Sequence, residues 1–369
     1  MLTILLTVVL APLSTEDAMV EIGTELELHS EILDEDRTVL VGLPYGYADS
    51  QLSYPLLIVL DGGTATSLAH AVSTMEMLDS KSLAPQMIVA GLDTGVGVRD
   101  YFPQPIESRP GSGHAEGFLR FIGEELVPHL EREYRTAPCV VLFGGSNAGM
   151  FTVYAMLSEQ GSFSGYVAAS PSLGWFADYF SESIGDFAPS GDTRLYLNWG
   201  SDDIESIVLS ATPGLAEDLA SAFSDSGSYR YEAIQDGGHV PYVSLYRGLQ
   251  WVFQGWRMPD GAIVAEGLSG LQEHYAGLSN QYGFVVRVPA GKFMTLGQHH
   301  LRGGDFEGAR EVFSAYLEAW PCSSRAAFFL GEAHRLLGDN QAAIDYYTRA
   351  QELDPGFAPA GARIRSLQE

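Results

Sequence analysis

The stretch that decides the fold reads Val140-Val141-Leu142-Phe143-Gly144-Gly145-Ser146-Asn147-Ala148-Gly149-Met150-Phe151-Thr152-Val153-Tyr154-Ala155-Met156-Leu157. It opens with a continuous apolar run, as expected of a strand that is buried on both faces. It closes with apolar residues at helical spacing, so the chain passes here from a strand to a helix. Ser146 stands between the two among small residues, which allow the sharp turn of a nucleophile elbow.

The elbow pattern G-x-S-x-G is matched except at its last position, where Ala148 stands and Gly149 follows. The amide of Asn147 begins the new helix and points to where an oxyanion would form. A lone match of this kind is also compatible with an ordinary glycine-rich turn. The rest of the chain therefore has to decide between the two interpretations.

Composition excludes several classes of partner. The chain has 369 residues and a formal net charge of −27. Such an acidic surface repels nucleic acid and anionic membrane faces, so we expect neither as a partner. The two cysteines have no metal-ligand spacing, and no metal or organic cofactor is implied.

The N-terminal residues form an apolar run that is too short to span a bilayer, followed by polar sequence. We expect residues 1–18 to be a signal peptide, although the run lacks a basic n-region, and the protein to be secreted or periplasmic. The alternative is a mis-assigned start or an N-terminal strand. No later segment is long and apolar enough to predict a membrane span.

Strand-like runs alternate with helical patterns over residues 19–257, which predicts an α/β domain with a mostly parallel sheet and helices on both faces. Ligand sites of such sheets lie beyond the carboxyl ends of the strands. A long Gly- and Pro-rich loop from Asp93 to Gly113 is placed to form one wall of a cleft.

A serine nucleophile needs a base and an orienting carboxylate, and on the α/β-hydrolase fold the chain order is serine, acid, histidine. His239 fits this order, because it follows the last predicted strand and precedes the closing helix. We choose Asp203 as the acid, and Asp202 and Glu205 remain alternatives since one residue of register decides between them. For the second oxyanion donor beside Asn147 we choose the amide of Gly63, after an early strand.

At this point the chain resembles the putative-esterase family of α/β-hydrolases, which includes esterase D-like enzymes, siderophore trilactone esterases and feruloyl esterases. The resemblance covers about Leu26 to Trp256. It implies Ser146 as nucleophile, His239 as base and an acid in the loop after Gly200. The matching motifs are Leu60-Asp61-Gly62-Gly63, Arg99-Asp100-Tyr101-Phe102-Pro103, Glu124-Glu125-Leu126-Val127-Pro128, the elbow, Ala169-Ser170-Pro171-Ser172 and Gly237-Gly238-His239.

Two positions depart from the family pattern. Ala148 replaces the second elbow glycine, and Gly145 stands where a bulkier residue is common.

The C-terminal part repeats at a spacing of 34 residues, with Leu296-Gly297 returning as Leu330-Gly331. This period resembles tetratricopeptide repeats over residues 291–369, after a helical linker at 258–290. About two repeats are visible, so we expect them to dock on the hydrolase domain or on the helix near Leu271 to Leu278. They could bind a protein partner, mediate self-association or serve as a structural cap.

The first hypothesis for function is a serine esterase that acts on a small ester or lactone, with Tyr101 and Trp175 as substrate contacts. A second is a non-catalytic scaffold that works through the repeats. A third is an acyltransferase with the same triad. The sequence does not identify the ester.

Overall fold

The computed structural model describes residues 22–93, 97–158, 163–189, 193–224 and 228–368. The predicted signal peptide at residues 1–18 lies outside these ranges and stays a prediction. Among the described residues, no helix has the length and the apolar composition needed to cross a membrane.

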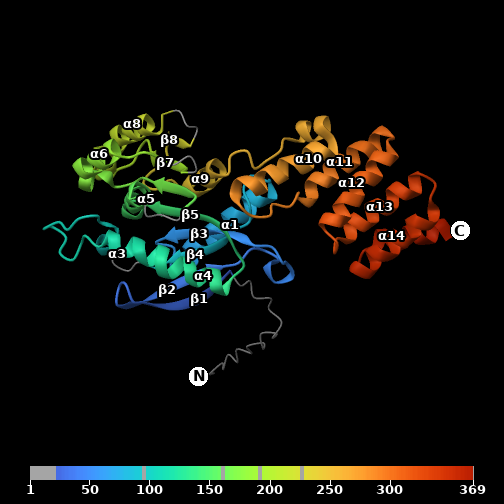
Figure 1. Cartoon of the computed structure of the whole chain (residues 1–369), viewed down its shortest axis with the longest axis horizontal. Helices are drawn as coiled ribbons and strands as arrows, with labels where there is room; N and C mark the ends of the chain where they lie inside the picture. The colour runs from blue at the N-terminus through green and yellow to red at the C-terminus, as the bar shows by residue number, and fades with distance from the viewer. Residues whose placement is uncertain (1–21, 94–96, 159–162, 190–192, 225–227, 369) are drawn as a thin grey trace, which may run out of the picture.

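Within the described residues, eight strands form one sheet in the order β1-β2-β4-β3-β5-β6-β7-β8 (Figure 1). β2 is antiparallel to β1 and β4, and the other neighbouring strands are parallel. This arrangement confirms the predicted α/β-hydrolase fold. The strands are β1 (Thr24–Ser30), β2 (Glu35–Gly42), β3 (Tyr54–Leu60), β4 (Ile88–Leu92), β5 (Thr136–Gly145), β6 (Gly165–Ala169), β7 (Leu195–Gly200) and β8 (Tyr229–Ile234).

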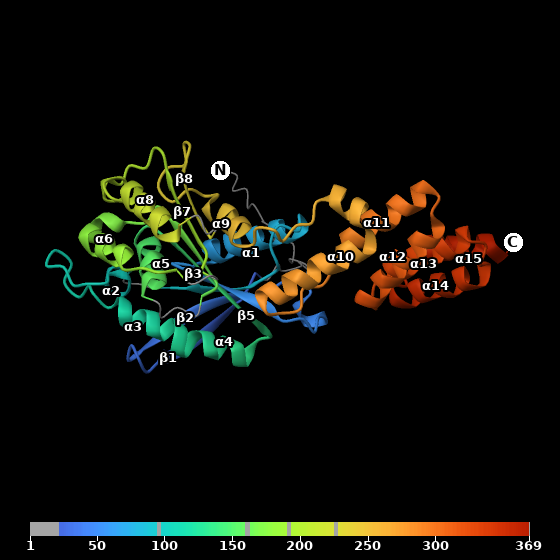
Figure 2. The ribbon, with the colours of Figure 1, turned by 45° about the horizontal axis from the view of Figure 1, so that its top comes forward.

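Helices cover both faces of the sheet because its central strands are apolar on both faces. In β3, Leu56 and Ile58 pack into one core and Leu57 and Val59 into the other. Figure 2 shows α1 and α9 on one face and α3 and α4 on the other. The helices of this part are α1 (Ala65–Ser80), α2 (Gly97–Tyr101), α3 (Ala115–Arg120), α4 (Val127–Glu133), α5 (Asn147–Leu157), α6 (Ala177–Gly185), α7 (Ser206–Leu209), α8 (Thr212–Phe223) and α9 (Ser244–Val252), with short 3-10 turns at Tyr47–Asp49 and Leu173–Phe176.

The helical segment over residues 115–133 is continuous but not regular. A π-helical segment, η2 (Phe121–Leu126), joins α3 to α4. Pro128 has no amide hydrogen, so it cannot close the normal bond to the carbonyl four residues back. The preceding turn widens, and the Val127 amide donates to the Ile122 carbonyl five residues back.

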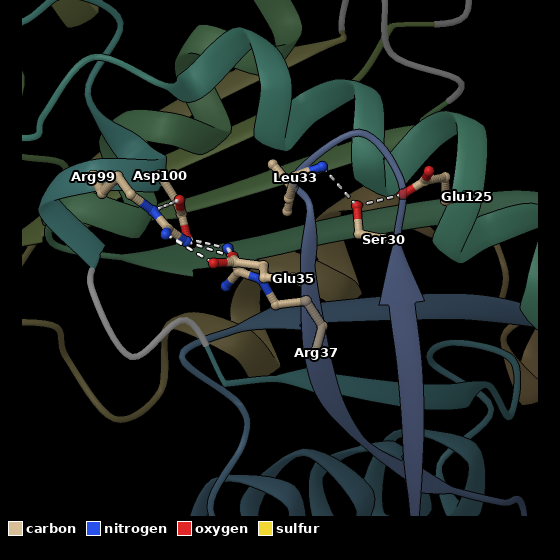
Figure 3. Close-up of polar contacts among 7 residues, drawn as sticks. All are labelled: Ser30, Leu33, Glu35, Arg37, Arg99, Asp100 and Glu125. Atoms are coloured by element: carbon tan, nitrogen blue, oxygen red, sulfur yellow. Dashed lines mark hydrogen bonds and ion pairs between the residues drawn. The ribbon is translucent and has the colours of Figure 1, made fainter.

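The segment from Asp93 to Gly113 is not the structureless loop that the sequence predicts. Residues 97–101 form α2, and residues 94–96 lie outside the described part of the chain. Two salt-bridged arginines hold α2 against β2 (Figure 3). Arg37 on β2 binds Asp100 at 2.7 Å, and Arg99 on α2 binds Glu35 at 2.6 Å and Asp100 at 2.8 Å.

Asp100 is 1% exposed, so its charge is stable only with these partners. Hydrogen bonding from Arg99 holds the pKa of Glu35 below its usual value. Ser30 and Glu125 make a second tie between the N-terminal hairpin and η2, with Ser30 Oγ donating to Glu125 Oε2 at 2.5 Å (Figure 3).

The C-terminal part is helical and extends away from the sheet (Figures 1 and 2). The pair α11–α12 returns as α13–α14 with each helix start displaced by 34 residues, as the repeat predicts. At the crossings, a Cβ on Gly297 would lie 2.4 Å from Phe313, and one on Gly331 would lie 2.8 Å from Tyr347. The helices are α10 (Asp260–Tyr282), α11 (Ala290–Gly303), α12 (Phe306–Ala319), α13 (Ser324–Leu336), α14 (Asn340–Leu353) and α15 (Ala358–Gln368).

One hydrophobic core continues from the face of the sheet under α1 and α9 into the repeats, and it includes Leu271, Tyr275 and Leu278 of α10. The repeats therefore dock through α10, near the helix that the sequence singles out. The change from sheet to helices falls between α9 and α10, and the proposed domain limits at 257–258 and 290–291 remain predictions.

Replacing Asp100 with Asn is expected to lower the free energy of unfolding by about 3 kcal/mol, because two buried or half-buried arginines lose one of the two carboxylates that neutralise them. The measurement is urea unfolding followed by circular dichroism. The control is Glu124→Gln, whose partner Arg120 is 47% exposed and whose pair contributes no more than about 1 kcal/mol. Equal losses in the two variants would contradict this account of the cluster.

Candidate active site

Ser146 lies at the sharp turn between β5 and α5 with φ 57° and ψ −120°. A residue other than glycine is strained at positive φ, and such strain is typical of a nucleophile elbow. The turn is held by backbone bonds, with the Ser146 amide donating to the Ala169 carbonyl at 2.9 Å. A Cβ on Gly144 would lie 2.3 Å from the Ala148 carbonyl oxygen, so the glycine before the turn is required.

The Ala148 side chain is fully buried. The close approach to the neighbouring strand is made by Gly149 and not by position 148. A Cβ on Gly149 would lie 2.9 Å from the Ala169 carbonyl oxygen. The departure from the elbow pattern at position 148 therefore leaves the turn intact.

Asp203 and His239 meet at the carboxyl ends of β7 and β8. His239 Nδ1 lies 3.0 Å from Asp203 Oδ2 and 3.1 Å from Oδ1. The Asp203 side chain is 0% exposed and the His239 side chain is 29% exposed. The Glu205 amide also donates to Asp203 Oδ1 at 2.9 Å, so the buried carboxylate is hydrogen-bonded from two sides.

The other two candidate acids, Asp202 and Glu205, do not contact the imidazole through any hydrogen bond between described residues. Asp202 Oδ1 accepts from the Gly238 amide at 2.8 Å and so holds the backbone of the histidine loop. Glu205 lies exposed on the surface. Of the three acids that the sequence leaves open, the structure brings Asp203 to the imidazole.

Two glycines let the histidine loop approach the elbow. A Cβ on Gly200 would lie 2.1 Å from the Gly238 carbonyl oxygen, and one on Gly145 would lie 2.7 Å from Val240 Cγ1. The bulkier residue common at position 145 has no room here, because Val240 occupies its place. His239 therefore sits one residue from a side chain that packs on the residue before Ser146.

The serine hydroxyl has a partner that the sequence did not assign. Ser146 Oγ lies 3.3 Å from Ser172 Oγ, and among the described residues no hydrogen bond joins it to His239. Ser172 is 1% exposed, and its amide donates to the Ser146 carbonyl at 3.1 Å. The Ser170-Pro171-Ser172 loop at the end of β6 was the signal for this contact, since it falls at the ligand-binding edge of the sheet.

The amide of Gly63, expected as an oxyanion donor, is directed elsewhere. It donates to the Leu92 carbonyl at 3.1 Å, so it connects the loop after β3 to the end of β4. In the described part of the chain, the amides of Thr64 and Asn147 have no hydrogen-bond acceptor. Each lies at the start of a helix, where the free amides carry partial positive charge.

Tyr101, expected as a substrate contact, is a buried structural residue. It is 1% exposed, and its hydroxyl donates to Asp61 Oδ1 at 2.8 Å. Its ring packs on Phe118 and Phe151. The sequence does not show that α2 turns this side chain into the core, and the structure lends no support to a substrate contact at Tyr101.

Trp175 is half-buried and lies between Phe102 and Arg109. The Arg109 guanidinium carbon lies 5.6 Å from the centre of the Trp175 ring. Arg109 is exposed and forms no ion pair with a described residue, unlike Arg99, which Glu35 and Asp100 neutralise. Trp175 and Arg109 therefore remain available to a ligand.

No group of three or more His, Cys, Asp or Glu side chains in the described ranges is arranged to hold a metal ion.

Comparisons with known proteins agree with this geometry. A family described as "Putative esterase" matches residues 30–205, and a tetratricopeptide repeat family matches residues 294–356. The sheet domain is thus similar to this esterase family over residues 30–205. The C-terminal helices are similar to tetratricopeptide repeats over residues 294–356.

A curated relative is the ferri-bacillibactin esterase BesA of Bacillus subtilis, which is 29% identical over 182 residues. The match covers 44% of this chain and 62% of the relative, so the chain spans about three fifths of that protein's length.

Solved structures share the fold. An IroE-like serine hydrolase from Shewanella oneidensis has a TM-score of 0.66 at 23% identity, over 80% of this chain and 99% of the other. An uncharacterised protein from Capnocytophaga ochracea has a TM-score of 0.61 at 19% identity, over 94% of this chain and 99% of the other.

Replacing Tyr101 with Phe is expected to lower the free energy of unfolding by about 1 kcal/mol, because the hydroxyl that binds Asp61 is lost. The measurement is urea unfolding. Tyr45→Phe is the control, since Tyr45 is 84% exposed and its loss should leave stability unchanged. Unaltered stability in Tyr101→Phe would contradict the structural role.

Proposed function

We propose that this protein is a serine carboxylic-ester hydrolase that works through Ser146, His239 and Asp203 and forms an acyl-enzyme. The observation that carries the proposal is the buried Asp203 carboxylate on His239 Nδ1, in a loop that packs against the nucleophile elbow. The match of residues 30–205 to the esterase family and the 29% identity to a named esterase support it.

In the proposed mechanism, Ser146 Oγ leaves its contact with Ser172 and attacks the ester carbonyl while His239 Nε2 takes its proton. Asp203 fixes the tautomer with the hydrogen on Nδ1 and stabilises the imidazolium that forms. Hydrogen bonds of catalytic groups are often long before substrate binds, so the 3.3 Å contact to Ser172 describes the resting serine.

The amides of Asn147 and Thr64 are proposed as the oxyanion donors, with Thr64 replacing Gly63. Both are free among the described residues, whereas the Gly63 amide is bonded to Leu92. His239 then returns its proton to the leaving alcohol and activates the water that hydrolyses the acyl-enzyme.

The proposed substrate is a small ester or lactone of the kind that siderophore esterases cleave. The relative named a ferri-bacillibactin esterase supports this class. Arg109 over Trp175 offers a cation and an aromatic face to an anionic, aromatic part of such a molecule. An acyltransferase would use the same residues, and analysis of products with water and with an alcohol as acceptor separates the two.

The repeats are proposed to bind a protein partner or a second copy of the chain, and a location outside the cytoplasm is proposed from the N-terminal segment. A scaffold without catalysis is the opposing candidate, and it predicts no ester hydrolysis at all.

Hydrolysis of p-nitrophenyl esters of graded acyl length is expected for the wild type and absent for Ser146→Ala. Asp203→Asn should lower kcat roughly ten-thousand-fold, because the imidazole loses the acceptor that sets its tautomer.

Asp202→Asn is the matched control, one residue away. Its side-chain oxygen still accepts from the Gly238 amide, so its activity should stay close to that of the wild type. A larger loss in Asp202→Asn than in Asp203→Asn would reverse the assignment of the acid.

Gly145→Ala is expected to lower kcat/KM roughly ten- to hundredfold, because the new methyl displaces Val240 and with it the imidazole. The double variant Gly145→Ala/Val240→Ala removes the colliding methyl groups and should recover most of the activity. No recovery in a folded double variant would show that Gly145 acts in another way.

A further inference from the structure

A cavity of about 540 Å³ lies where the sheet domain meets the helical region. Its walls come from the start of β3, the turn after α1, the segment that follows α9, and the chain from Phe284 to Thr295 around the start of α11. Ser146 follows the carboxyl end of β5, which is parallel to β3 and ten residues long. The cavity and the serine therefore lie at opposite ends of the sheet, about 30 Å apart.

The charge around this cavity is opposite to that of the protein. The chain has 47 acidic and 20 basic residues, and its only lysines are Lys81 and Lys292. Both line the cavity, together with Arg257 and Arg287, against the two carboxylates Asp79 and Asp260.

Three of the four cations are unpaired. Lys81, Arg257 and Arg287 form no ion pair with a described residue. They are exposed, yet they gather at one site on a surface where carboxylates outnumber them. Mutual repulsion disfavours such a cluster unless an anion compensates it.

The floor of the cavity adds two features that favour an anion. Lys292 is 7% exposed, and its Nζ donates to the Met258 carbonyl at 3.2 Å and to Asp260 at 3.1 Å. Ala290 and Gly291 also line the cavity and form the N-terminus of the 14-residue α11, whose free amides point outward from the helix end.

Aromatic rings form the apolar part of the wall. Trp256 is 5% exposed and stacks on Phe284 at 6.3 Å, with 27° between the ring planes. Trp320 lies under the guanidinium of Arg287 at 5.8 Å. A cavity with both charge and aromatic surface suits a ligand that has both an acidic group and a flat apolar body.

We propose that this cavity is a second ligand site, distinct from the serine site, that binds a small organic anion: a carboxylate or phosphate carried on an aromatic body. The acidic group would lie among Lys81, Arg287 and the start of α11, and the aromatic body would lie against Trp256 and Phe284. The volume is within the range of small-molecule sites. The proposal does not depend on the esterase activity.

The test is isothermal titration of the full chain with phenyl phosphate and with benzoate at low ionic strength. One of these anions is expected to bind with a stoichiometry of one, while the neutral benzamide does not bind. Inorganic phosphate should bind at least tenfold more weakly than the aromatic anion that binds, because it lacks the aromatic body. In Lys81→Gln/Arg287→Gln, the affinity should fall at least tenfold through the loss of two charge-assisted contacts.

The matched control is Arg132→Gln/Arg302→Gln, which removes the same charge from exposed positions outside the cavity and should bind as the wild type does. The proposal is overturned if neither anion binds, if benzamide or inorganic phosphate binds as tightly as the aromatic anion, or if the two double variants behave alike. Ester hydrolysis takes no part in this readout, so the result is separate from the outcome for the serine site.

Discussion

The close approach of the histidine loop to the nucleophile elbow is the constraint on which the site depends. The backbone of Gly200 lies against the backbone of Gly238, and the side chain of Val240 fills the space over Gly145. The loop is then fixed electrostatically, with Asp202 on the Gly238 amide and Asp203 on the imidazole. The two successive carboxylates therefore have different roles. Asp202 holds the backbone of the histidine loop, and Asp203 holds the imidazole ring.

The opposite wall of the site depends on buried charge. α2 is short, and it is held by the Arg37–Asp100 and Arg99–Glu35 pairs that connect it to β2. From this anchored helix Tyr101 binds Asp61 at the end of β3, and Phe102 packs on Trp175. The geometry of the site thus also depends on buried residues of α2 and β2, since they set where Asp61 and Trp175 lie.

Much of this could be predicted from the sequence, because the signals were local. The apolar run before Ser146 and the helical spacing after it predicted β5, the elbow and α5, and the 34-residue repeat predicted the two helix pairs at their observed positions. The order of groups on the fold placed the acid in the loop after Gly200, and it left Asp202, Asp203 and Glu205 open. These patterns are fixed by periodicity and by chain order.

The features that the sequence did not predict depend on interactions between distant segments. The Gly63 amide donates a hydrogen bond to the Leu92 carbonyl, and this contact between two strands is not visible in any local sequence pattern. Tyr101 turns inward from α2, which is held by salt bridges to β2 between residues more than 60 positions apart in the chain. The cluster of cations around the cavity next to the repeats could not be predicted from the sequence either, since its members come from three separate segments.

The most direct test of the central claim is mass spectrometry of the intact protein after treatment with a fluorophosphonate, followed by mapping of the modified peptide. A single adduct on Ser146 is predicted, and it should be lost when His239 is replaced with Ala in a folded protein. An adduct on Ser172, or no adduct on the folded wild type, would contradict the assignment of Ser146 as the nucleophile.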